Sequence, residues 1–414
     1  MYAKVYSKTL VLSFLMVILL AGCRTNCTKT ISYRAFVPVY MSMTDIRAIN
    51  QVHPSKGLSD PGKIYVYKNL LLINERYEGV HVYNNSDPSN PVALKFVAIK
   101  GCLDMDVVDD VMIANQGADL VSWDISDPSN PIFVQRLESI MNHELLKNDS
   151  FPIAMEERDI VEVIEDANCG DGRRFGGGVF VSEDASNPGG PGGQSGQAGS
   201  MSRFAYVDGY LYIVDSDNLR SLDMSDIRNI SVSGNQQISW EVETIFPYND
   251  FLFLGTTTGM VVLNRVVNPK VPIWTTSFTH ARGCDPVVVY DDKAYVTLRG
   301  GSRCGAAEDA LHIVDISKIE QPTLLESYMM EGPFGLAASD SLLLICDGTA
   351  GLKAFDRRFT FEMNNHLYST LEGKNTYDVI LSGETAILSA EEGIFQIDYS
   401  DPTTPEEIST ILAH

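Results

Sequence analysis

The sequence predicts an all-β fold, a seven-bladed β-propeller of four-stranded antiparallel blades that follows an N-terminal lipoprotein signal peptide. Three observations support this prediction: a repeated Asp-Pro turn, short apolar runs between the turns, and a spacing of 40 residues between the two clearest turns. A repeat of that length matches one four-stranded propeller blade. Six or eight blades are also compatible with the pattern.

The clearest turns are Ser-Asp-Pro-Ser-Asn-Pro at 86–91 and 126–131, and Ser-Asp-Pro-Thr-Thr-Pro at 400–405. Weaker copies stand at 225–229, 268–272 and 317–322. Asp and Asn side chains accept hydrogen bonds from nearby backbone amides, whereas proline fixes its own φ and ends a strand ladder. Each copy therefore marks a point where one strand ends and the chain turns into the next.

Short apolar runs lie before and after each turn and are typical of strands. In the first unit they cover 64–67, 70–73 and 79–83. A fourth strand follows each turn, as the run 132–137 does after the second turn. The run 342–345, Leu-Leu-Leu-Ile, is apolar on both sides, as expected for a strand buried between two blades. The seven units begin near Lys63, Cys102, Arg203, Val242, Asp285, Gly332 and Asn375.

The first residues have the form of a secretory signal peptide. Lys4 and Lys8 precede the apolar run 10–20, which is too short for a comfortable membrane span and ends at Leu20-Ala21-Gly22-Cys23. This ending resembles the bacterial lipobox, which implies cleavage before Cys23 and acylation of its thiol. The expected domains are a signal peptide at 1–22, a tether and N-terminal strand segment at 23–61, and the propeller at 62–414.

Charge and the residues after the lipobox indicate where the protein works. The formal net charge is -23, and loss of Lys4 and Lys8 with the signal peptide makes it -25. Such a surface repels nucleic acid and anionic lipid head groups, so we expect membrane attachment through N-terminal acyl chains alone. Arg24-Thr25-Asn26 lacks the aspartate of the enteric inner-membrane retention signal. We therefore expect an outer-membrane lipoprotein, facing either the periplasm or the medium.

Two segments do not fit the repeat. Segment 32–61 either adds a strand to the last blade or lies across one face. The insertion 138–200 is longer and richer in glycine than a blade connection needs. We expect short helices at 142–147 and 155–166, and flexible chain over 169–200. The insertion is either a solvated loop over one face or a lid or partner-binding arm.

The cysteines favour disulfide chemistry over metal binding. Cys284 and Cys304 lie in one repeat on either side of a strand and are the best disulfide candidates in an exported protein. The pairing of Cys27, Cys102, Cys169 and Cys346 stays open. The sequence has no Cys-x-x-Cys unit, no complete zinc motif and no phosphate-binding loop, so we expect no metal and no cofactor.

The run Leu311-His312-Ile313-Val314-Asp315-Ile316-Ser317, together with the Asp-Pro turns, resembles the LVIVD-repeat proteins. The mature chain is similar to their lipoprotein members from Bacteroidetes-type bacteria, with further matches at 34–42, 61–64 and 283–286 and at Cys304-Gly305. The resemblance implies a β-propeller but no catalytic residues, and none is predicted here. The insertion 138–200 is where this chain departs from the family.

A propeller brings the first residues of its inner strands together at the mouth of a central channel. Aligning the seven units places these residues there: Lys63, Asp104, Arg203, Thr244, Asp285, Gly335 and Asp378. His280 and Arg282, just before Asp285, can join them. Acids and bases around one ring either bind a polar ligand or satisfy strand-end amides and trapped water.

The leading functional hypothesis is a non-enzymatic, lipid-anchored propeller that binds or scaffolds a protein partner or a small polar ligand. One alternative is an extracytoplasmic hydrolase or lyase that acts through Asp104, Asp285, Asp378 and His280. Another is a structural subunit of an envelope complex, with the insertion 138–200 as its docking arm.

Overall fold

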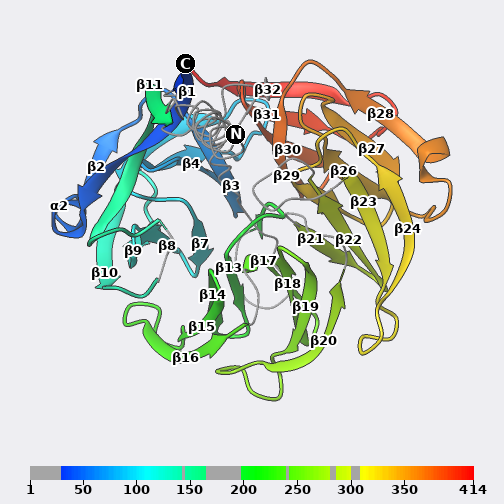
Figure 1. Ribbon diagram of the computed structural model, residues 1–414, viewed down its shortest axis with the longest axis horizontal. Coiled ribbons are helices and arrows are strands. Elements are labelled where there is room, and N and C mark those ends of the chain that lie inside the picture. The colour runs from blue at the N-terminus through cyan, green and yellow to red at the C-terminus, as the bar shows by residue number, and fades with distance from the viewer. Residues whose placement is uncertain (1–28, 142–144, 165–196, 239–241, 280–285, 300–307) are drawn as a thin grey trace, which may run out of the picture. The chain divides into compact units, whose positions relative to one another are not determined.

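Apolar runs that end at Asp-Pro turns fold into seven antiparallel sheets, each containing four strands that are consecutive in the sequence. The computed structural model describes residues 29–141, 145–164, 197–238, 242–279, 286–299 and 308–414. The sheets follow one another around a central axis, with one strand of each lying innermost and another on the rim (Figure 1). The predicted all-β, seven-bladed propeller is confirmed.

Blades 1 to 4 are built as follows. Blade 1 contains β3 (Pro61–Tyr67), β4 (Leu70–Glu75), β5 (Gly79–Asn84) and β6 (Val92–Ala98). Blade 2 contains β7 (Met105–Val108), β8 (Val111–Gln116), β9 (Asp119–Asp124) and β10 (Ile132–Leu137). Blade 3 contains β13 (Phe204–Val207), β14 (Tyr210–Asp215), β15 (Asn218–Asp223) and β16 (Ser231–Gln237). Blade 4 contains β17 (Val242–Tyr248), β18 (Phe251–Thr256), β19 (Gly259–Asn264) and β20 (Ile273–Thr279).

Blades 5 to 7 repeat this plan. Blade 5 contains β21 (Val287–Tyr290), β22 (Lys293–Leu298), β23 (Ala310–Asp315) and β24 (Thr323–Met329). Blade 6 contains β25 (Leu336–Ala338), β26 (Leu342–Cys346), β27 (Leu352–Asp356) and β28 (Leu367–Leu371), with the 3-10 helix η1 (Met363–His366) before β28. Blade 7 contains β29 (Thr376–Ser382), β30 (Thr385–Ala390), β31 (Gly393–Asp398) and β32 (Glu406–Leu412).

Two extra strands join blade 1. Strand β2 (Gln51–Pro54) pairs with β6 on the outer edge, and β12 (Gln197–Ala198) pairs with β3 on the inner edge. Segment 32–61 thus adds its strand to the first blade, which corrects the expected alternatives of the last blade or one face. It also contacts the last blade, because Leu58 accepts the backbone N–H of His414 at 2.9 Å and packs in one buried cluster with Ile387 and Ile394.

The chain divides into two compact units, Met1–Val37 with Glu156–Phe180 and Pro38–Met155 with Val181–His414. The second unit holds the seven blades. Strands β1 (Lys29–Ser42) and β11 (Ser150–Ile164) form a separate two-stranded ribbon, of which residues 29–37 and 156–164 belong to the first unit.

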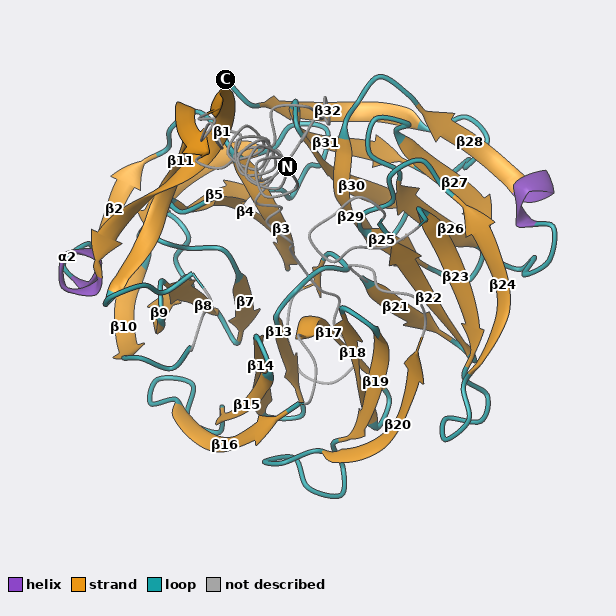
Figure 2. Ribbon diagram, in the orientation of Figure 1, coloured by secondary structure: helices purple, strands orange, loops and turns teal. Residues whose placement is uncertain are grey.

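The helix expected at 155–166 is wrong, because β11 runs through Ile164. Its β-branched residues Ile160, Val161 and Val163 favour a strand, and pairing with β1 satisfies its backbone groups. The helix expected at 142–147 is also wrong for its described part, since 145–147 form a turn and a bridge. The described helices, α2 (Met43–Arg47) and η1, lie at the rim (Figure 2).

Helix α2 packs on the hairpins of blades 1 and 2. Its buried Met43 and Ile46 contact a small apolar cluster that includes Tyr77, Ala118 and Phe151. The Arg47 guanidinium donates to both carboxylate oxygens of the fully buried Asp119, at 2.7 and 2.8 Å. No helix within the described ranges is long and apolar enough to cross a membrane.

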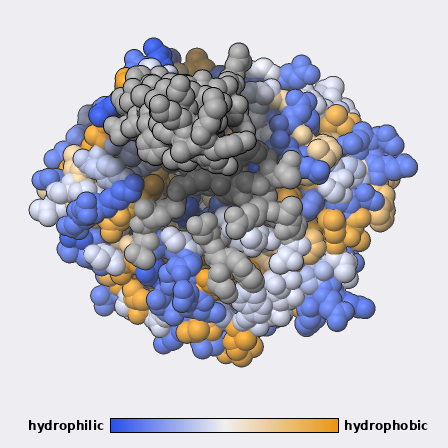
Figure 3. Space-filling model, in the orientation of Figure 1, coloured by the Kyte–Doolittle hydropathy of each residue, from blue (hydrophilic) through white to orange (hydrophobic). Residues whose placement is uncertain are grey.

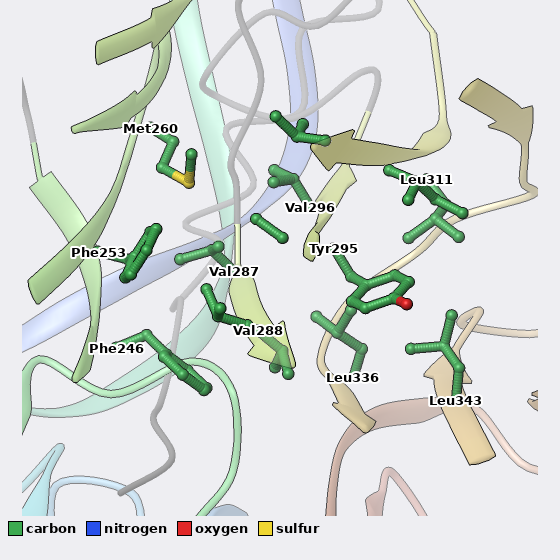
Figure 4. Packing of buried hydrophobic residues seen from close by; sticks show 14 of the residues in the cluster. Phe246, Phe253, Met260, Val287, Val288, Tyr295, Val296, Leu311, Leu336 and Leu343 are labelled. Atoms are coloured by element: carbon green, nitrogen blue, oxygen red, sulfur yellow. The ribbon is translucent and has the colours of Figure 1, made fainter. Parts of the chain in front are cut away.

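The strand β26 shows how one apolar run serves two blades. Leu343 and Ile345 face one buried cluster, whereas Leu342, Leu344 and Cys346 face another. Successive side chains of a strand point to opposite faces, so a strand between two neighbours is apolar on both. Figure 4 shows the first of these clusters, in which Leu343 and Leu336 of blade 6 lie near Tyr295 of blade 5.

The repeated turns have the hydrogen bonds that the sequence predicts. Asp87 Oδ1 accepts from the backbone N–H of Ser89, and Asp124 Oδ1 accepts from that of Ser126, both at 3.0 Å. The same pattern recurs at Asp223, Asp315 and Asp398, each two residues before its donor. Hydrogen bonding by Ser126 is the main reason that the pKa of Asp124 falls to about 2.

These turns also hold neighbouring blades together, because their carbonyl groups accept hydrogen bonds from the preceding blade. The Ser369 hydroxyl of blade 6 donates to Pro402 O at 2.7 Å, and the Tyr212 hydroxyl of blade 3 donates to Pro269 O at 3.0 Å. The seam between the last and first blades uses the same chemistry, since Ser409 Oγ donates to Pro88 O at 2.6 Å. The ring therefore closes with the contacts that it uses elsewhere.

Apolar packing adds to this seam. Ile380, Ile387 and Ile394 of blade 7 form one buried cluster with Ile64, Leu71 and Ile73 of blade 1. The side-chain amides of Asn85 and Gln396 exchange two hydrogen bonds across it, at 2.9 and 2.7 Å.

We predict that Ile387→Ala will destabilise the ring by roughly 2–5 kcal/mol, because a side chain that is 1% exposed leaves a cavity at the seam. Chemical denaturation measures this change. Ile273→Ala is the matched control, since Ile273 also lies in a strand but is 47% exposed. Equal stabilities for the two variants would show that the seam is not needed for closure.

Candidate functional site

The centre of the ring is crossed by residues 197–202, here called the strap, which connect the insertion to blade 3. Gln197 and Ala198 form β12 and pair with β3 of blade 1. Ser200 and Ser202 follow and are 2% and 1% exposed. The polar side chains at the inner ends of the blades surround this segment. Their hydrogen bonds and ion pairs therefore show which groups at the predicted channel mouth bind the strap.

Ser200 joins the strap to blades 6 and 7. Its backbone N–H and hydroxyl donate to Asp378 Oδ1, at 3.2 and 3.4 Å, and its hydroxyl accepts from the backbone N–H of Leu336 at 2.7 Å. Ser202 joins the strap to blades 2 and 4. Its hydroxyl donates to Asp104 Oδ2 at 2.9 Å, and its carbonyl accepts from the backbone N–H of Ile245 at 2.8 Å.

Asp104 and Lys63 form a buried ion pair, with 2.5 Å between Nζ and Oδ2. The carboxylate also accepts the backbone N–H of Arg203 at 2.8 Å. Burial lowers the pKa of Lys63, while the negative charge of Asp104 opposes that shift. A buried carboxylate needs donors to offset its lost hydration, and Asp104 finds them in blades 1, 2 and 3 and in the strap.

The buried side chain of Asp378 lies between two glycines, Gly199 of the strap and Gly335 of blade 6. Burial raises its pKa to about 7, and its Oδ2 atom has no hydrogen-bond partner within the described part of the chain. A Cβ added to Gly199 would lie 1.8 Å from Oδ2, and one added to Gly335 would lie 2.2 Å from Oδ1. A larger residue at either position would therefore force the Asp378 side chain to shift.

Asp106 is a further buried acid near the centre of the ring, and the sequence analysis missed it. The Tyr65 hydroxyl of blade 1 donates to its Oδ1, and the backbone N–H of Tyr206 in blade 3 donates to its Oδ2 at 3.0 Å. Burial raises its pKa to about 7. The available signal was an acid inside an otherwise apolar inner strand, Met105–Val108.

The strand register tests the alignment of the seven units. In blades 2, 3 and 6, one residue at the same position of the second strand donates its backbone N–H to the carbonyl of Asp104, Arg203 and Gly335, respectively. In blades 4 and 7, the residue at that position of the second strand pairs with Thr244 and Asp378. In blade 5 the equivalent carbonyl belongs to Pro286. Asp285, His280 and Arg282 themselves lie outside the described residues.

The structure brings part of the predicted set together around the strap. Lys63 pairs with Asp104, which also accepts the backbone N–H of Arg203. Asp378 accepts from the strap and is close enough to Lys63 for their charges to interact. Thr244 lines a separate hollow. In the described region, the carboxylates of Asp104 and Asp378 bind the protein's own strap and are 3% exposed.

A further set of acid–base pairs lies at the ends of the second strands. The members are buried acids bonded to a base on the third strand: Glu75 with His81 at 2.8 Å, Asp215 with Arg220 at 2.7 Å, and Asp347 with Lys353 at 2.5 Å. Burial favours a raised pKa for Glu75, but hydrogen bonds from His81 and Ser59 prevail and lower it to about 2. These pairs brace the hairpins, and the sequence analysis did not single them out.

The remaining sequence predictions concern the cysteines, metal binding and the N-terminus, and only some of these residues are described. Cys102 and Cys346 are buried free thiols, and burial raises the pKa of both. No group of three or more His, Cys, Asp or Glu side chains within the described ranges is placed to hold a metal ion. The signal peptide at 1–22, Cys23 and the candidate disulfide Cys284–Cys304 lie outside the described residues.

Comparison with known proteins adds to this picture. The family model of the LVIVD repeat matches residues 111–138 and 284–330. The described residues of these spans lie in blades 2 and 5. No curated protein matches the chain.

Solved propellers share the fold at low identity. The periplasmic gluconolactonase of Pseudomonas aeruginosa is 9% identical, with a TM-score of 0.56 over 85% of this chain and 96% of that one. A candidate 6-phosphogluconolactonase of Bacteroides fragilis is 9% identical, with a TM-score of 0.54 over 87% and 97%. The computationally designed Ika8 protein is 11% identical, with a TM-score of 0.52 over 87% and 90%. At these identities the likeness concerns the fold alone.

We predict that Gly199→Ala will destabilise the protein by about 1–3 kcal/mol, because the new methyl group collides with Asp378. Gly57→Ala is the control, since no atom lies within 4 Å of a Cβ there. In denaturant titrations, adding Asp378→Ala to Gly199→Ala should recover part of the loss caused by the glycine substitution. A Gly199→Ala protein with the wild-type midpoint would contradict the strap geometry.

Stability should fall as pH rises from about 4 to above 7. The pKa values of Asp106 and Asp378 lie near 7 in the folded chain and near 3.8 in the unfolded chain, so unfolding releases protons in this window. The contribution is fully present below pH 3.8 and is lost as pH rises through 7. Glu75, with its pKa lowered from 4.5 to about 2, gives the opposite trend only below pH 4.5.

The measurement is the denaturation midpoint at pH 5 and pH 8. Asp378→Asn should show a clearly smaller drop than the wild type, because its side chain carries no proton to lose. Asp250→Asn, on an exposed turn, is the control and should keep the wild-type drop. An unchanged drop in Asp378→Asn would mean that this carboxyl is already ionised at pH 5.

Proposed function

We propose that this chain is a lipid-anchored, extracytoplasmic β-propeller of an LVIVD-repeat lipoprotein, acting as a binding or scaffold module for a protein partner or a small polar ligand. The observation that carries the proposal is the use of Asp104 and Asp378. Both are buried and bonded to the strap, so neither carboxyl group is presented to a substrate from solvent. The lipobox at Cys23 supports the anchor and the outer-membrane location.

The space-filling view is consistent with a binding role for the surface. On the face shown in Figure 3, hydrophilic residues predominate and the hydrophobic ones gather in small groups toward the rim. Exposed apolar side chains include Val266, Val267 and Phe361, at 56, 68 and 60%.

The hydrolase alternative would need an acid that reaches a substrate. The gluconolactonase and 6-phosphogluconolactonase propellers make a sugar lactone the natural test compound, although the likeness to them is of fold. The structural-subunit alternative differs from the leading proposal only in its partner, with the insertion 138–200 as the docking arm. Part of that insertion, β11 and the strap, already belongs to the fold.

The location is tested by Cys23→Ser in the full chain. We expect this variant to appear in the soluble fraction or to stay uncleaved, whereas the wild type fractionates with the outer membrane and takes up labelled fatty acid. Unchanged, lipid-labelled protein from the Cys23→Ser chain would contradict the anchor.

The binding role is tested by crosslinking the intact lipoprotein in cells and comparing it with a chain whose residues 165–196 are replaced by a Gly-Ser segment of equal length. This design leaves β11 and the strap in place. A partner that is lost with the replacement supports a docking arm, and one that is retained supports a blade surface. Hydrolysis of glucono-δ-lactone by the wild type, lost in a folded Asp378→Asn variant, would overturn the non-enzymatic proposal.

A further inference from the structure

The turns between the third and fourth strands of the blades differ in chemistry around the ring. In five blades this turn has a serine followed by a charged residue, as in Ser126-Asp127 of blade 2 and Ser317-Lys318 of blade 5. Blade 4 has Val266-Val267 at these two positions, and blade 6 has Arg358-Phe359. The turn of blade 6 is also longer and contains Phe361.

These apolar side chains are exposed to solvent. Val266, Val267 and Phe361 are more than half exposed, Phe359 is 43% exposed, and Val271 in the same turn of blade 4 is 39% exposed. We call these five side chains the apolar rim. A monomeric propeller has no evident need for them, since five of its blades make the same turn with polar residues.

The backbone of the two turns shows that the exposed side chains are not needed to form them. Asn264 Oδ1 accepts from the backbone N–H of Val266 at 3.1 Å, as Asp124 Oδ1 does from that of Ser126. Asp356 Oδ1 accepts from the backbone N–H of Arg358 at 3.1 Å in the same way. The conserved geometry lies in the first residue of each turn, so the apolar tips are free to serve another purpose.

The apolar tips lie on one face of the ring. The blades share one antiparallel strand order, so equivalent turns lie on the same face. In Figure 2 the turns that lead into β20, β24 and β28 follow one another along the rim, with the turn of blade 5 in the middle. Figure 3, in the same orientation, shows hydrophobic groups in these parts of the rim.

Neighbouring blades hold these turns in place. Thr276 Oγ1 of blade 4 donates to Glu320 O in the turn of blade 5 at 3.2 Å. The Tyr328 hydroxyl of blade 5 donates to Thr360 O in the turn of blade 6 at 2.7 Å. The tips are therefore presented on fixed backbone, and a contact there costs little further ordering of the chain.

Local charge separates this part of the rim from the rest. The turns of blades 4, 5 and 6, at 264–272, 315–322 and 356–366, together contain five Lys or Arg and four Asp or Glu. Those of blades 7, 1 and 2, at 398–405, 84–91 and 124–131, contain five Asp and no base. The charge of the whole chain led us to expect attachment through acyl chains alone, but this side of the ring lacks that acidity.

We propose that the apolar rim rests on the lipid surface to which the acylated Cys23 anchors the protein. Phe and Val side chains enter the boundary between head groups and acyl chains, while neighbouring bases such as Lys270 reach the lipid phosphates. The acidic turns across the ring then stand away from the head groups, which would repel them. The inference rests on the proposed lipid anchor and deepens it by naming the face that touches the bilayer.

The shape of the rim favours lipid over a protein partner. Its tips project from two blades that are separated by the more polar turn of blade 5, Asp315 to Pro322. A stable protein interface needs a continuous, closely packed core, whereas a bilayer deforms around separate tips.

The test is co-sedimentation of the mature chain, residues 23–414, with vesicles of phosphatidylcholine and phosphatidylethanolamine. The chain is made without acylation, so that only its own surface can hold it on the vesicles, and it keeps every described residue. We expect saturable binding that is half complete at about 1 mM accessible lipid.

Paired variants assign the binding to the rim. Val267→Ser combined with Phe361→Ser should weaken vesicle binding about tenfold, because both side chains then stay in water. Val92→Ser combined with Ile132→Ser is the matched control and should bind like the wild type, since these residues are 48 and 57% exposed but belong to blades 1 and 2. Phe361→Trp keeps an aromatic ring suited to the lipid interface and should retain binding. Melting temperatures measured alongside show whether each variant is folded.

Three outcomes would overturn the inference. The first is no binding by the wild type up to about 10 mM lipid. The second is wild-type binding by the folded double variant of Val267 and Phe361. The third is self-association without lipid, seen by sedimentation velocity and lost in that variant, together with no vesicle binding, which would assign the rim to a second copy of the chain.

Failure of the anchor would be a separate result. The Cys23→Ser experiment in cells reports on acylation, whereas the vesicle assay uses a chain that carries no acyl group. A chain that is acylated in cells but does not bind vesicles by itself would keep the proposed anchor and lose the rim contact.

Discussion

Two buried carboxylates at the inner ends of the blades, Asp104 and Asp378, organise the centre of this propeller. A carboxyl group removed from water must be hydrogen-bonded, paired or protonated, and here all three solutions occur within one network. Asp104 pairs with Lys63, both acids accept hydrogen bonds from the strap, and Asp378 has a pKa near 7. The strap therefore crosses the centre of the ring where a donor is needed.

The repeats and the irregular segments have different tasks. The repeats supply apolar strands with two buried faces and turns whose carbonyl groups accept hydrogen bonds from the preceding blade. Because the seam between blades 7 and 1 uses these same contacts, closure needs no blade built from both ends of the chain. The insertion then adds a link that the repeats lack, a segment bonded to several blades at once across the centre.

The acidic composition has a structural basis as well as an effect on solubility. Asp124, Asp223, Asp315 and Asp398 end strands and accept backbone N–H groups in the turns. Hydrogen bonds from the hydroxyl and the backbone of the serine two residues on are the main cause of their lowered pKa values. Other acids close hairpins by pairing with a base in the same blade. Much of the negative charge thus serves the turns and hairpins of the repeat.

The sequence by itself determined the all-β class, the seven units, their strands and the chemistry of the turns, because these depend on local periodicity and on side chains that bond within two or three residues. It also aligned Lys63, Asp104, Arg203, Thr244 and Asp378 at one position of the repeat, since the units repeat in length. Only the tertiary structure decided that residues 197–202 cross the centre of the ring and that β11 is a strand. Those outcomes depend on pairing between residues far apart in the chain, such as Ser200 with Asp378, and no local pattern specifies which distant groups will satisfy a buried charge.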